Sequence, residues 1–346
     1  MKRALAALLV VQLGQFGQLT EARANIWADA IAQSAPDPSK QVYEKAMRDG
    51  DDHVLLANIE SSARAERRRQ VQNALDAYRR AAAARPTEAE PYFRIGATLN
   101  SFYLDSCFTI PQLNYTPSPL RDCRSDTIDP VIAQQTIDAW TAAEARAPLD
   151  PRFSASEGES VLFDRAILHT KLGTKQSLEE AARDYERYLE RSDGKNENIE
   201  NAWSNLAETY MMLGRLEDSI NAYRELPYTA EVSTIYGAAV ALDRDERGEL
   251  AKQLILAQGA SGFATFRLRV ERGDTFFVPT GEKFYYYALA EETFGRVDAA
   301  IGYWRQYIGS GAHPQFHPRA KQHIDALLLR KRARPSSPVD PFLDMR

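Results

Sequence analysis

Residues 203–223 constrain the fold more than any other part of this chain. Their first half carries large apolar side chains at spacings of three and four, which share one face of an α-helix: Trp203, Leu206, Tyr210 and Leu213. Gly214 follows them and can adopt the positive φ angle that ends a helix. Ser219 and Tyr223 then share one face of a second helix. One such helix pair cannot bury its apolar faces alone, so we expect neighbouring pairs.

The same two-helix pattern recurs on both sides of this segment. Two stretches share the spacing of a small residue, an aromatic residue, an alanine and a proline: Ala74, Tyr78, Ala81 and Pro86, then Thr136, Trp140, Ala143 and Pro148. Further copies cover residues 162–188 and 284–307, and the second of these contains Trp304. A more degenerate helix pair spans residues 231–259. The chain is therefore predicted to repeat one helix–turn–helix unit along most of its length.

The order and spacing of these residues resemble the tetratricopeptide repeat (TPR), a helix–turn–helix unit of about 34 residues. The resemblance covers roughly residues 55–308 and is strongest at 203–223. It implies an all-α fold, a right-handed superhelical solenoid of about five to six TPR-like helix pairs. It assigns structural positions of the repeat to the following residues: Trp203, Leu206, Ala207, Tyr210, Gly214, Tyr223, Trp140 and Trp304.

One repeat carries an insertion that holds both cysteines. Pro86 and Pro148 lie 62 positions apart, about 28 more than one repeat requires. The extra residues fall at about 101–130, a proline-containing stretch that includes Cys107 and Cys123. In an exported chain, an even number of cysteines within one loop favours a disulfide bond between them. Two reduced thiols are the alternative.

The two ends of the chain have different characters. Residues 1–24 combine a basic start, a short apolar run and the small residues Ala22 and Ala24, which is typical of a cleavable signal peptide. A plain amphipathic helix is the alternative. The solenoid is expected to span residues 25–334 and to end in a capping helix at about 318–332. Residues 335–346 are rich in proline and serine and are predicted to be disordered.

The sequence offers little sign of chemistry. It contains none of the usual nucleophile, phosphate-binding or zinc-binding motifs, so we predict neither an enzyme nor a bound cofactor or metal. The cluster of His313, His317 and His323 is interrupted by prolines, which favours surface and capping roles over metal binding. A formal net charge of −5, with 43 basic and 48 acidic residues, argues against a nucleic-acid partner.

In TPR proteins, the first helix of each pair lines a concave groove where partner segments bind. The resemblance places five residues at the groove position of successive first helices: Phe93, Phe163, Ser204, Ile235 and Tyr285. Four of them are apolar or aromatic, and an exposed apolar stripe usually marks an interaction site. The alternative is that the insertion or the N-terminal segment covers this stripe. The lysine and asparagine pattern that grips a C-terminal carboxylate in this family is missing.

These expectations combine into one functional hypothesis. The chain is predicted to be a non-catalytic, exported TPR scaffold that binds a protein partner in the cell envelope through its groove. Its location would be periplasmic or secreted. The alternative is a cell-wall or glycan-binding accessory protein of an envelope enzyme, in which tyrosine and tryptophan faces would contact the glycan.

Overall fold

The computed structural model describes most of the chain between residues 37 and 333. The described ranges are 37–59, 63–104, 120, 128–149, 155–192, 198–227, 231–273, 275 and 277–333. Within these ranges the chain forms helices and no β-strand. The predicted signal peptide at 1–24, both cysteines and the predicted tail at 335–346 lie outside the described residues.

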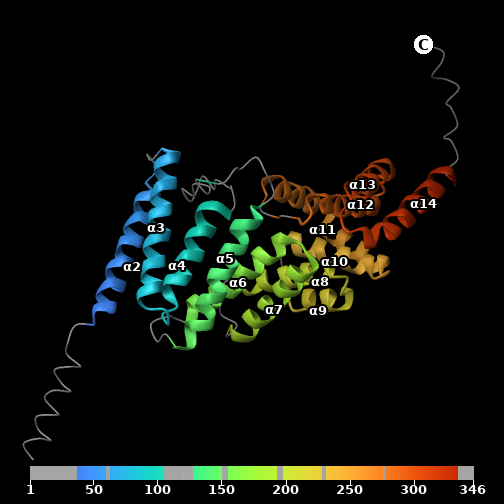
Figure 1. Cartoon of the computed structure of the whole chain (residues 1–346). Coiled ribbons are helices and arrows are strands. Elements are labelled where there is room, and N and C mark those ends of the chain that lie inside the picture. Colours follow the sequence, from blue (N-terminus) through green and yellow to red (C-terminus); the bar gives the residue numbers. More distant parts are fainter. Residues whose placement is uncertain are drawn as a thin grey trace, which may run out of the picture.

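Helices follow one another in pairs along the chain (Figure 1). The pairs found in the described ranges are α2 (Pro38–Ala57) with α3 (Arg64–Ala84), α4 (Glu90–Leu99) with α5 (Pro130–Arg146), α6 (Ala155–Leu172) with α7 (Lys175–Arg191), α8 (Ile199–Met212) with α9 (Leu216–Arg224), α10 (Val232–Arg244) with α11 (Gly248–Arg272), and α12 (Lys283–Thr293) with α13 (Val297–Ser310). The last helix, α14 (His317–Ala333), packs against α13 and falls where the sequence predicts a terminal helix.

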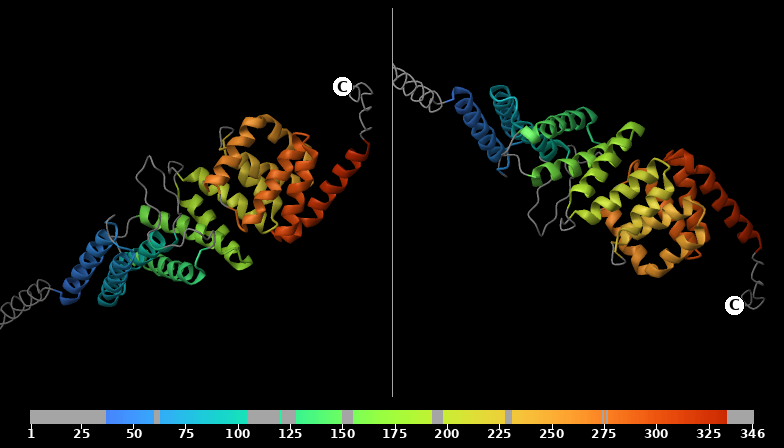
Figure 2. Two further views of the ribbon diagram at one scale, coloured as in Figure 1. Left: turned by 90° about the horizontal axis from the view of Figure 1, so that it is seen from above. Right: turned by 90° about the horizontal axis from the view of Figure 1, so that it is seen from below.

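The helix pairs form an elongated array rather than a closed bundle. Figure 1 shows α2 and α3 at one end and α14 at the other, and the two views in Figure 2 show the same order. Packing is closest within each pair, and the remaining contacts join each pair to its neighbours. First helices of successive pairs also meet each other, as in α6 with α8, α8 with α10, and α10 with α12. This row of first helices creates the surface on which the candidate site lies.

Short elements complete the array. The π-helix η1 (Asn100–Leu104) extends α4, and the 3-10 helix η2 (Ala147–Leu149) follows α5. The 3-10 helices η3 (Thr280–Glu282) and η4 (Pro314–Phe316) precede α12 and α14. Helix α11 bends at Gly259, where φ is 65° and ψ is −177°, so it consists of two helical arms.

The turns inside three pairs share one backbone geometry. At each of them a backbone N–H bonds to the carbonyl five residues earlier: Arg215 to Tyr210 at 2.8 Å, Arg247 to Leu242 at 2.8 Å, and Arg296 to Glu291 at 2.9 Å. Gly214 and Gly295 precede two of these donors and have the left-handed φ values of 78° and 76° that such a turn requires. Glu246 holds the equivalent place in the degenerate pair, with φ at 62°.

Small residues bring paired helices close together. A β-carbon at Gly96 in α4 would lie only 2.4 Å from the indole ring of Trp140 in α5. On the second helices, the predicted repeat residues Tyr78, Tyr185 and Tyr188 are buried. The repeat spacing in the sequence therefore marks the side chains that pack between the helices.

The three tryptophans of the predicted repeat differ in burial. Trp140 is 2% exposed and Trp304 is 0% exposed, so both are enclosed by the protein. Trp203 is only half-buried and packs against the edge of the core, although its neighbours Leu206 and Ala207 are buried. None of the described helices combines the length and apolar character that a membrane crossing requires.

A buried charge cluster fixes α14 to the array. The Asp243 carboxylate accepts hydrogen bonds from Arg319 at 2.8 Å, from His323 at 3.0 Å and from the Tyr285 hydroxyl at 2.7 Å. The other ring nitrogen of His323 lies 2.9 Å from Glu292. Burial alone would lower the pKa of His323, but its bonds to these two carboxylates raise that pKa to about 9. His323 is therefore a charged, structural residue of the interface between α14 and the preceding pairs.

Candidate functional site

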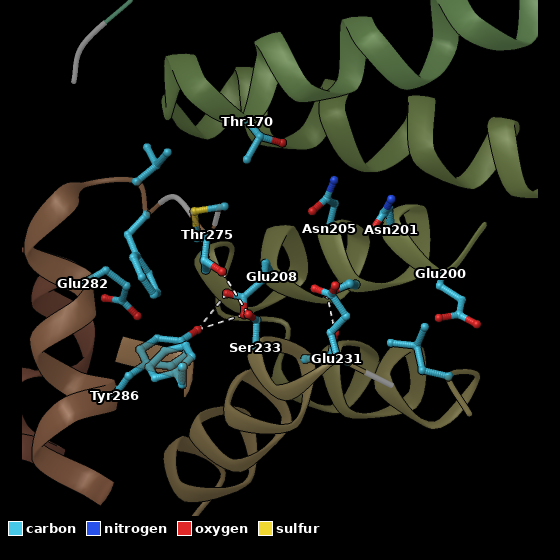
Figure 3. Close-up of a pocket in the computed structure, with 17 residues that line it drawn as sticks. Thr170, Glu200, Asn201, Asn205, Glu208, Glu231, Ser233, Thr275, Glu282 and Tyr286 are labelled. Atoms are coloured by element: carbon cyan, nitrogen blue, oxygen red, sulfur yellow. Dashed lines mark hydrogen bonds between the residues drawn. The ribbon is translucent and has the colours of Figure 1, made fainter. Parts of the chain in front are cut away.

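A pocket of about 150 Å³ opens between the first helices of the later pairs. Side chains from α6, α8, α10 and α12 line it, together with Phe266 of α11 and with Thr275, Phe277 and Val278. Figure 3 shows Thr170 at the top of the pocket, Glu282 and Tyr286 at the left, Asn201 and Asn205 at the right, and Glu208 near the centre. The pocket therefore lies along the row of first helices.

Helix α8 supplies a continuous face of this pocket. The lining residues recur at helical spacing along it: Asn201, Ser204, Asn205, Glu208 and Met212. The buried residues Ala202, Leu206 and Tyr210 alternate with them and point into the core. The amphipathic pattern of α8 thus serves packing on one face and leaves a polar face for the pocket.

Helix α10 forms the opposite wall together with Thr275, Phe277 and Val278. Ser233 lies 2.9 Å from Thr275, and Thr234 lies 3.3 Å from Ser204, so hydroxyl contacts join the walls. The backbone carbonyl of Val278 accepts a hydrogen bond from His313 at 2.9 Å. The contact with Ser233 holds Thr275 against α10, and the bond from His313 holds Val278 at one edge of the pocket.

Glu208 is the most unusual group in the pocket. The Tyr286 hydroxyl donates to both of its carboxylate oxygens, at 2.8 and 2.9 Å (Figure 3). The Tyr223 hydroxyl also donates to it, at 2.5 Å. Burial raises the pKa of Glu208, while the two tyrosine hydrogen bonds act in the opposite direction. A β-carbon at Gly237 would lie 2.1 Å from the Tyr223 hydroxyl, so this arrangement requires glycine there. The carboxylate is held by neutral donors and forms no ion pair with the described residues.

Glu282 is a buried carboxylate, whereas Glu208 is half-buried, and Glu282 has a cationic partner. Its Oε1 accepts a hydrogen bond from Arg244, which is buried beneath it. Arg244 also lies over the rings of Tyr285 and Phe316, at 4.4 and 4.0 Å from the ring centroids. The Oε2 atom of Glu282 is buried, yet it accepts no hydrogen bond from any residue that the structure describes.

Three aromatic rings form the apolar side of the pocket. Phe277 meets Tyr286 edge-on with ring centroids 4.9 Å apart, and Phe266 stacks on Tyr286 at 5.8 Å. Phe266 and Phe277 are themselves in edge contact at 6.5 Å. The site therefore combines carboxylates, amide and hydroxyl groups with an aromatic wall. Among the described lining residues, none is basic.

The five predicted groove residues occupy different environments in the structure. Ser204 lines the pocket. Phe93 and Phe163 are half-buried and pack against their own neighbours, with Phe163 in ring contact with Tyr188 at 5.3 Å. Ile235 is half-buried but does not line the pocket, where its neighbour Thr234 appears instead.

The prediction that Tyr285 faces the groove is wrong. Tyr285 is 0% exposed, packs edge-on against Trp304 and Tyr307, and donates its hydroxyl to Asp243. The neighbouring Tyr286 lines the pocket instead. The predicted groove position is therefore one residue out of phase with α12, and the pocket is lined by Tyr286 of this helix and by Glu282 of the preceding η3.

Sequence reasoning also missed the acidic character of the site. Glu208 stands at the second groove position of the best repeat and could have been identified from that spacing. Glu282 and Tyr286 carry no comparable signal, because the residues before α12 depart from the repeat. Among the described residues, no group of three or more His, Cys, Asp and Glu side chains is arranged to hold a metal ion.

No protein-family model matches the chain, and no curated protein matches it.

Proposed function

We propose that this chain is a non-catalytic scaffold of the TPR type and that it binds a segment of a partner protein in the pocket between its first helices. The observation that carries the proposal is the polar face of α8 formed by Asn201, Ser204, Asn205 and Glu208. The opposite face of α8 packs into the core. The polar face opens into a pocket between helices rather than onto a convex surface. Concave sites with a few convergent polar groups beside aromatic side chains are the usual places for a ligand to bind.

Several features support a right-handed TPR-like solenoid as the scaffold. Helices pack in successive pairs, and first helices of neighbouring pairs meet each other. The turns after Tyr210, Leu242 and Glu291 share one hydrogen-bond pattern, which indicates a repeated unit. In solenoids of this kind, stacked repeats create extended concave surfaces that bind partners.

The cellular setting of the proposal rests on the sequence of residues 1–24. A cleavable signal peptide there would place the mature chain, beginning at Asn25, in the periplasm or outside the cell. An oxidising compartment would also favour the disulfide between Cys107 and Cys123. N-terminal sequencing of the native protein tests this part, and an intact Met1 on a cytoplasmic protein would contradict it.

Site-directed photo-crosslinking in the native cell tests the scaffold function. A photoreactive residue at Glu200, an exposed position on the pocket rim, should give a specific adduct with one partner protein. The matched position Glu217 is exposed on α9, outside the pocket, and should give no such adduct. Introducing Ser204→Trp into the Glu200 reporter should fill the pocket and remove the adduct. Equal crosslinking at both positions, or an adduct that survives Ser204→Trp, would contradict the proposal.

A further inference from the structure

We infer that the pocket selects an organic cation, a primary ammonium or guanidinium group on a short apolar stem, carried by a lysine or arginine side chain of the partner. This inference rests on the proposed scaffold function and names the chemistry of its partner. It follows from three features: the Glu208 carboxylate without an ionic partner among the described residues, the unpartnered acceptor on Glu282, and the aromatic wall beside them.

The charges of the pocket favour a cation over an anion. Four glutamates line it, and two of them are already paired: Glu282 with Arg244, and Glu231 with Arg269 at 2.8 Å. Glu208 and Glu200 form no ion pair with the described residues. An entering anion would face these carboxylates without a basic lining side chain, whereas a cation would neutralise the half-buried Glu208.

Glu282 gives an independent indication of a missing donor. The residue is 4% exposed, and its Oε1 is occupied by Arg244. Its Oε2 is buried without a hydrogen bond from the described residues, which is a costly state for a carboxylate oxygen. The nearest ring nitrogen of His313 lies 3.9 Å away, beyond hydrogen-bond distance, and burial lowers the pKa of that imidazole. An ammonium or guanidinium group carries several N–H donors and can satisfy more than one acceptor at once.

Figure 3 shows how the two carboxylates lie relative to the rings. The Glu282 carboxylate is on the pocket wall beside Tyr286, and Glu208 accepts from the Tyr286 hydroxyl. Tyr286 therefore stands next to both acidic groups, so a cation that enters between them also meets the aromatic wall.

The aromatic wall explains why the cation should carry an apolar stem. Phe266, Phe277 and Tyr286 lie within 6.5 Å of one another by ring centroid, on the same side of the pocket. Aromatic rings attract cations to their electron-rich faces, and they also cover the methylene groups of long side chains. A lysine or arginine side chain combines both features, whereas a metal ion would leave the rings without a partner.

The experiment compares the binding of small molecules that share a butyl stem to the full chain, measured by NMR or calorimetry. The probes are n-butylamine and n-butylguanidine as cations, and 1-butanol as the neutral counterpart. We expect the cations to bind saturably and at least tenfold more tightly than 1-butanol. Glu208→Gln keeps an acceptor for the tyrosines and should weaken cation binding about tenfold or more, while Glu217→Gln should leave it unchanged. Equal binding of 1-butanol, or an unchanged affinity in Glu208→Gln, would overturn the inference.

A pH series separates an electrostatic role of Glu208 from a structural one. The ionisable groups that act on Glu208 are the hydroxyls of Tyr223 and Tyr286 and, farther away, the paired Glu282 and Arg244. Burial outweighs them and raises the pKa of Glu208, so the cation must displace a proton when it binds at acidic pH.

The affinity for n-butylamine should therefore rise with pH until Glu208 is ionised, and 1-butanol should show no such trend. This dependence should disappear in Glu208→Gln. A flat profile for n-butylamine in the unmodified chain would overturn the inference even if the variant were destabilised.

Two further outcomes assign the source of the cation and keep the two proposals distinguishable. A capped tripeptide with one central lysine should bind more tightly than n-butylamine, and the reverse order would overturn the assignment to a protein side chain in favour of a free amine. If the Glu200 crosslink to the partner survives Glu208→Gln, the scaffold function stands and the cation inference falls. If cations bind selectively but Glu200 gives no protein adduct, the cation site stands and the scaffold function falls.

Discussion

The two ends of the array are built on different cores. In the N-terminal region, α2 to α5 pack around three small clusters that include Tyr78, Phe102 and Trp140, and the third of these also includes Val161 and Leu168 of α6. In the C-terminal region, α6 to α14 share one continuous cluster that extends from Leu162 to Leu327. Because stability in such arrays depends on contacts between neighbours, the continuous core is expected to unfold at higher denaturant than the three small clusters. The pocket lies within the region of the continuous core.

Within the described ranges, the C-terminal region also has more buried hydrogen bonds between helices than the N-terminal region has. In the C-terminal region, the buried Asp243, Glu282 and Arg244 form hydrogen-bonded ion pairs that join separate helices. Trp304 donates its indole N–H to Glu292 at 3.1 Å, whereas the indole nitrogen of Trp140 has no hydrogen-bond partner among the described residues. These networks add directional contacts to the C-terminal core, beyond its apolar packing.

The largest expected effect is on the continuous core. Trp304→Ala should destabilise the C-terminal region by about 3–5 kcal/mol, because the side chain is enclosed and a cavity would remain between α12, α13 and α14. The half-buried Trp203 is the matched control, and Trp203→Ala should cost less than about 2 kcal/mol. Urea unfolding followed by circular dichroism measures both. Equal losses for the two variants would show that the burial difference has no energetic meaning.

Removing the acceptor beneath α14 should have the next largest effect. Asp243→Asn leaves Arg319 and His323 facing an amide in a buried site, which should cost about 3 kcal/mol. Hydrogen exchange should show the loss first in α14 and α12 and leave α2 and α3 protected as before. An equal loss of protection in α2 and α3 would contradict the division into two regions.

The charge on His323 predicts a pH dependence that is confined to the C-terminal region. Its pKa is raised from 6.5 to about 9 in the folded state by its bonds to Asp243 and Glu292. The stabilisation is therefore fully present below about pH 6.5 and is lost as the pH rises through about 9, with a size on the order of 3 kcal/mol. Melting curves between pH 6 and 10 should show this decline, and His323→Gln should flatten it. A stability that rose with pH over this range would contradict the assignment.

The smallest effect tests the N-terminal packing. Gly96→Ala should destabilise the N-terminal region by about 1–3 kcal/mol, because the new methyl group would collide with the enclosed ring of Trp140. A β-carbon at Gly302 in α13 would have no other atom within 4 Å, so Gly302→Ala is the control and should stabilise its helix by about 0.5–1 kcal/mol. Urea denaturation of both variants measures the difference, and a neutral Gly96→Ala would mean that α4 and α5 can separate without cost.

Much of the local structure was predictable because it depends on short-range spacing. The first helix with Leu206 and Tyr210, the turn at Gly214 and the second helix with Tyr223 all lie where the sequence predicts them. The all-α character and the pairing of helices are confirmed for the described residues. Helical periodicity and glycine turns act over a few residues, so the sequence displays them directly.

The groove was harder to predict because it depends on how separate helices meet. Ser204 was identified from the repeat, but Tyr285 was assigned to the groove and is enclosed by Trp304, Tyr307 and Asp243. A shift of one position along α12 turns the side chain to another face of the helix, so Tyr286 lines the pocket while Tyr285 lies in the core. No pattern within α12 fixes that rotation, since residues 285–287 are all tyrosines.

The sequence by itself determined the kind of elements, their order and the turns that join them, because these follow from periodicity and from glycine at positive φ. Only the tertiary structure decided which polar groups share a site. Glu208 and Tyr286 are 78 residues apart, and their hydrogen bonds exist because α8 and α12 face the same pocket. Long-range burial also gave Glu208 its raised pKa, and long-range carboxylates gave His323 its charge, since both depend on neighbours that the local sequence does not reveal.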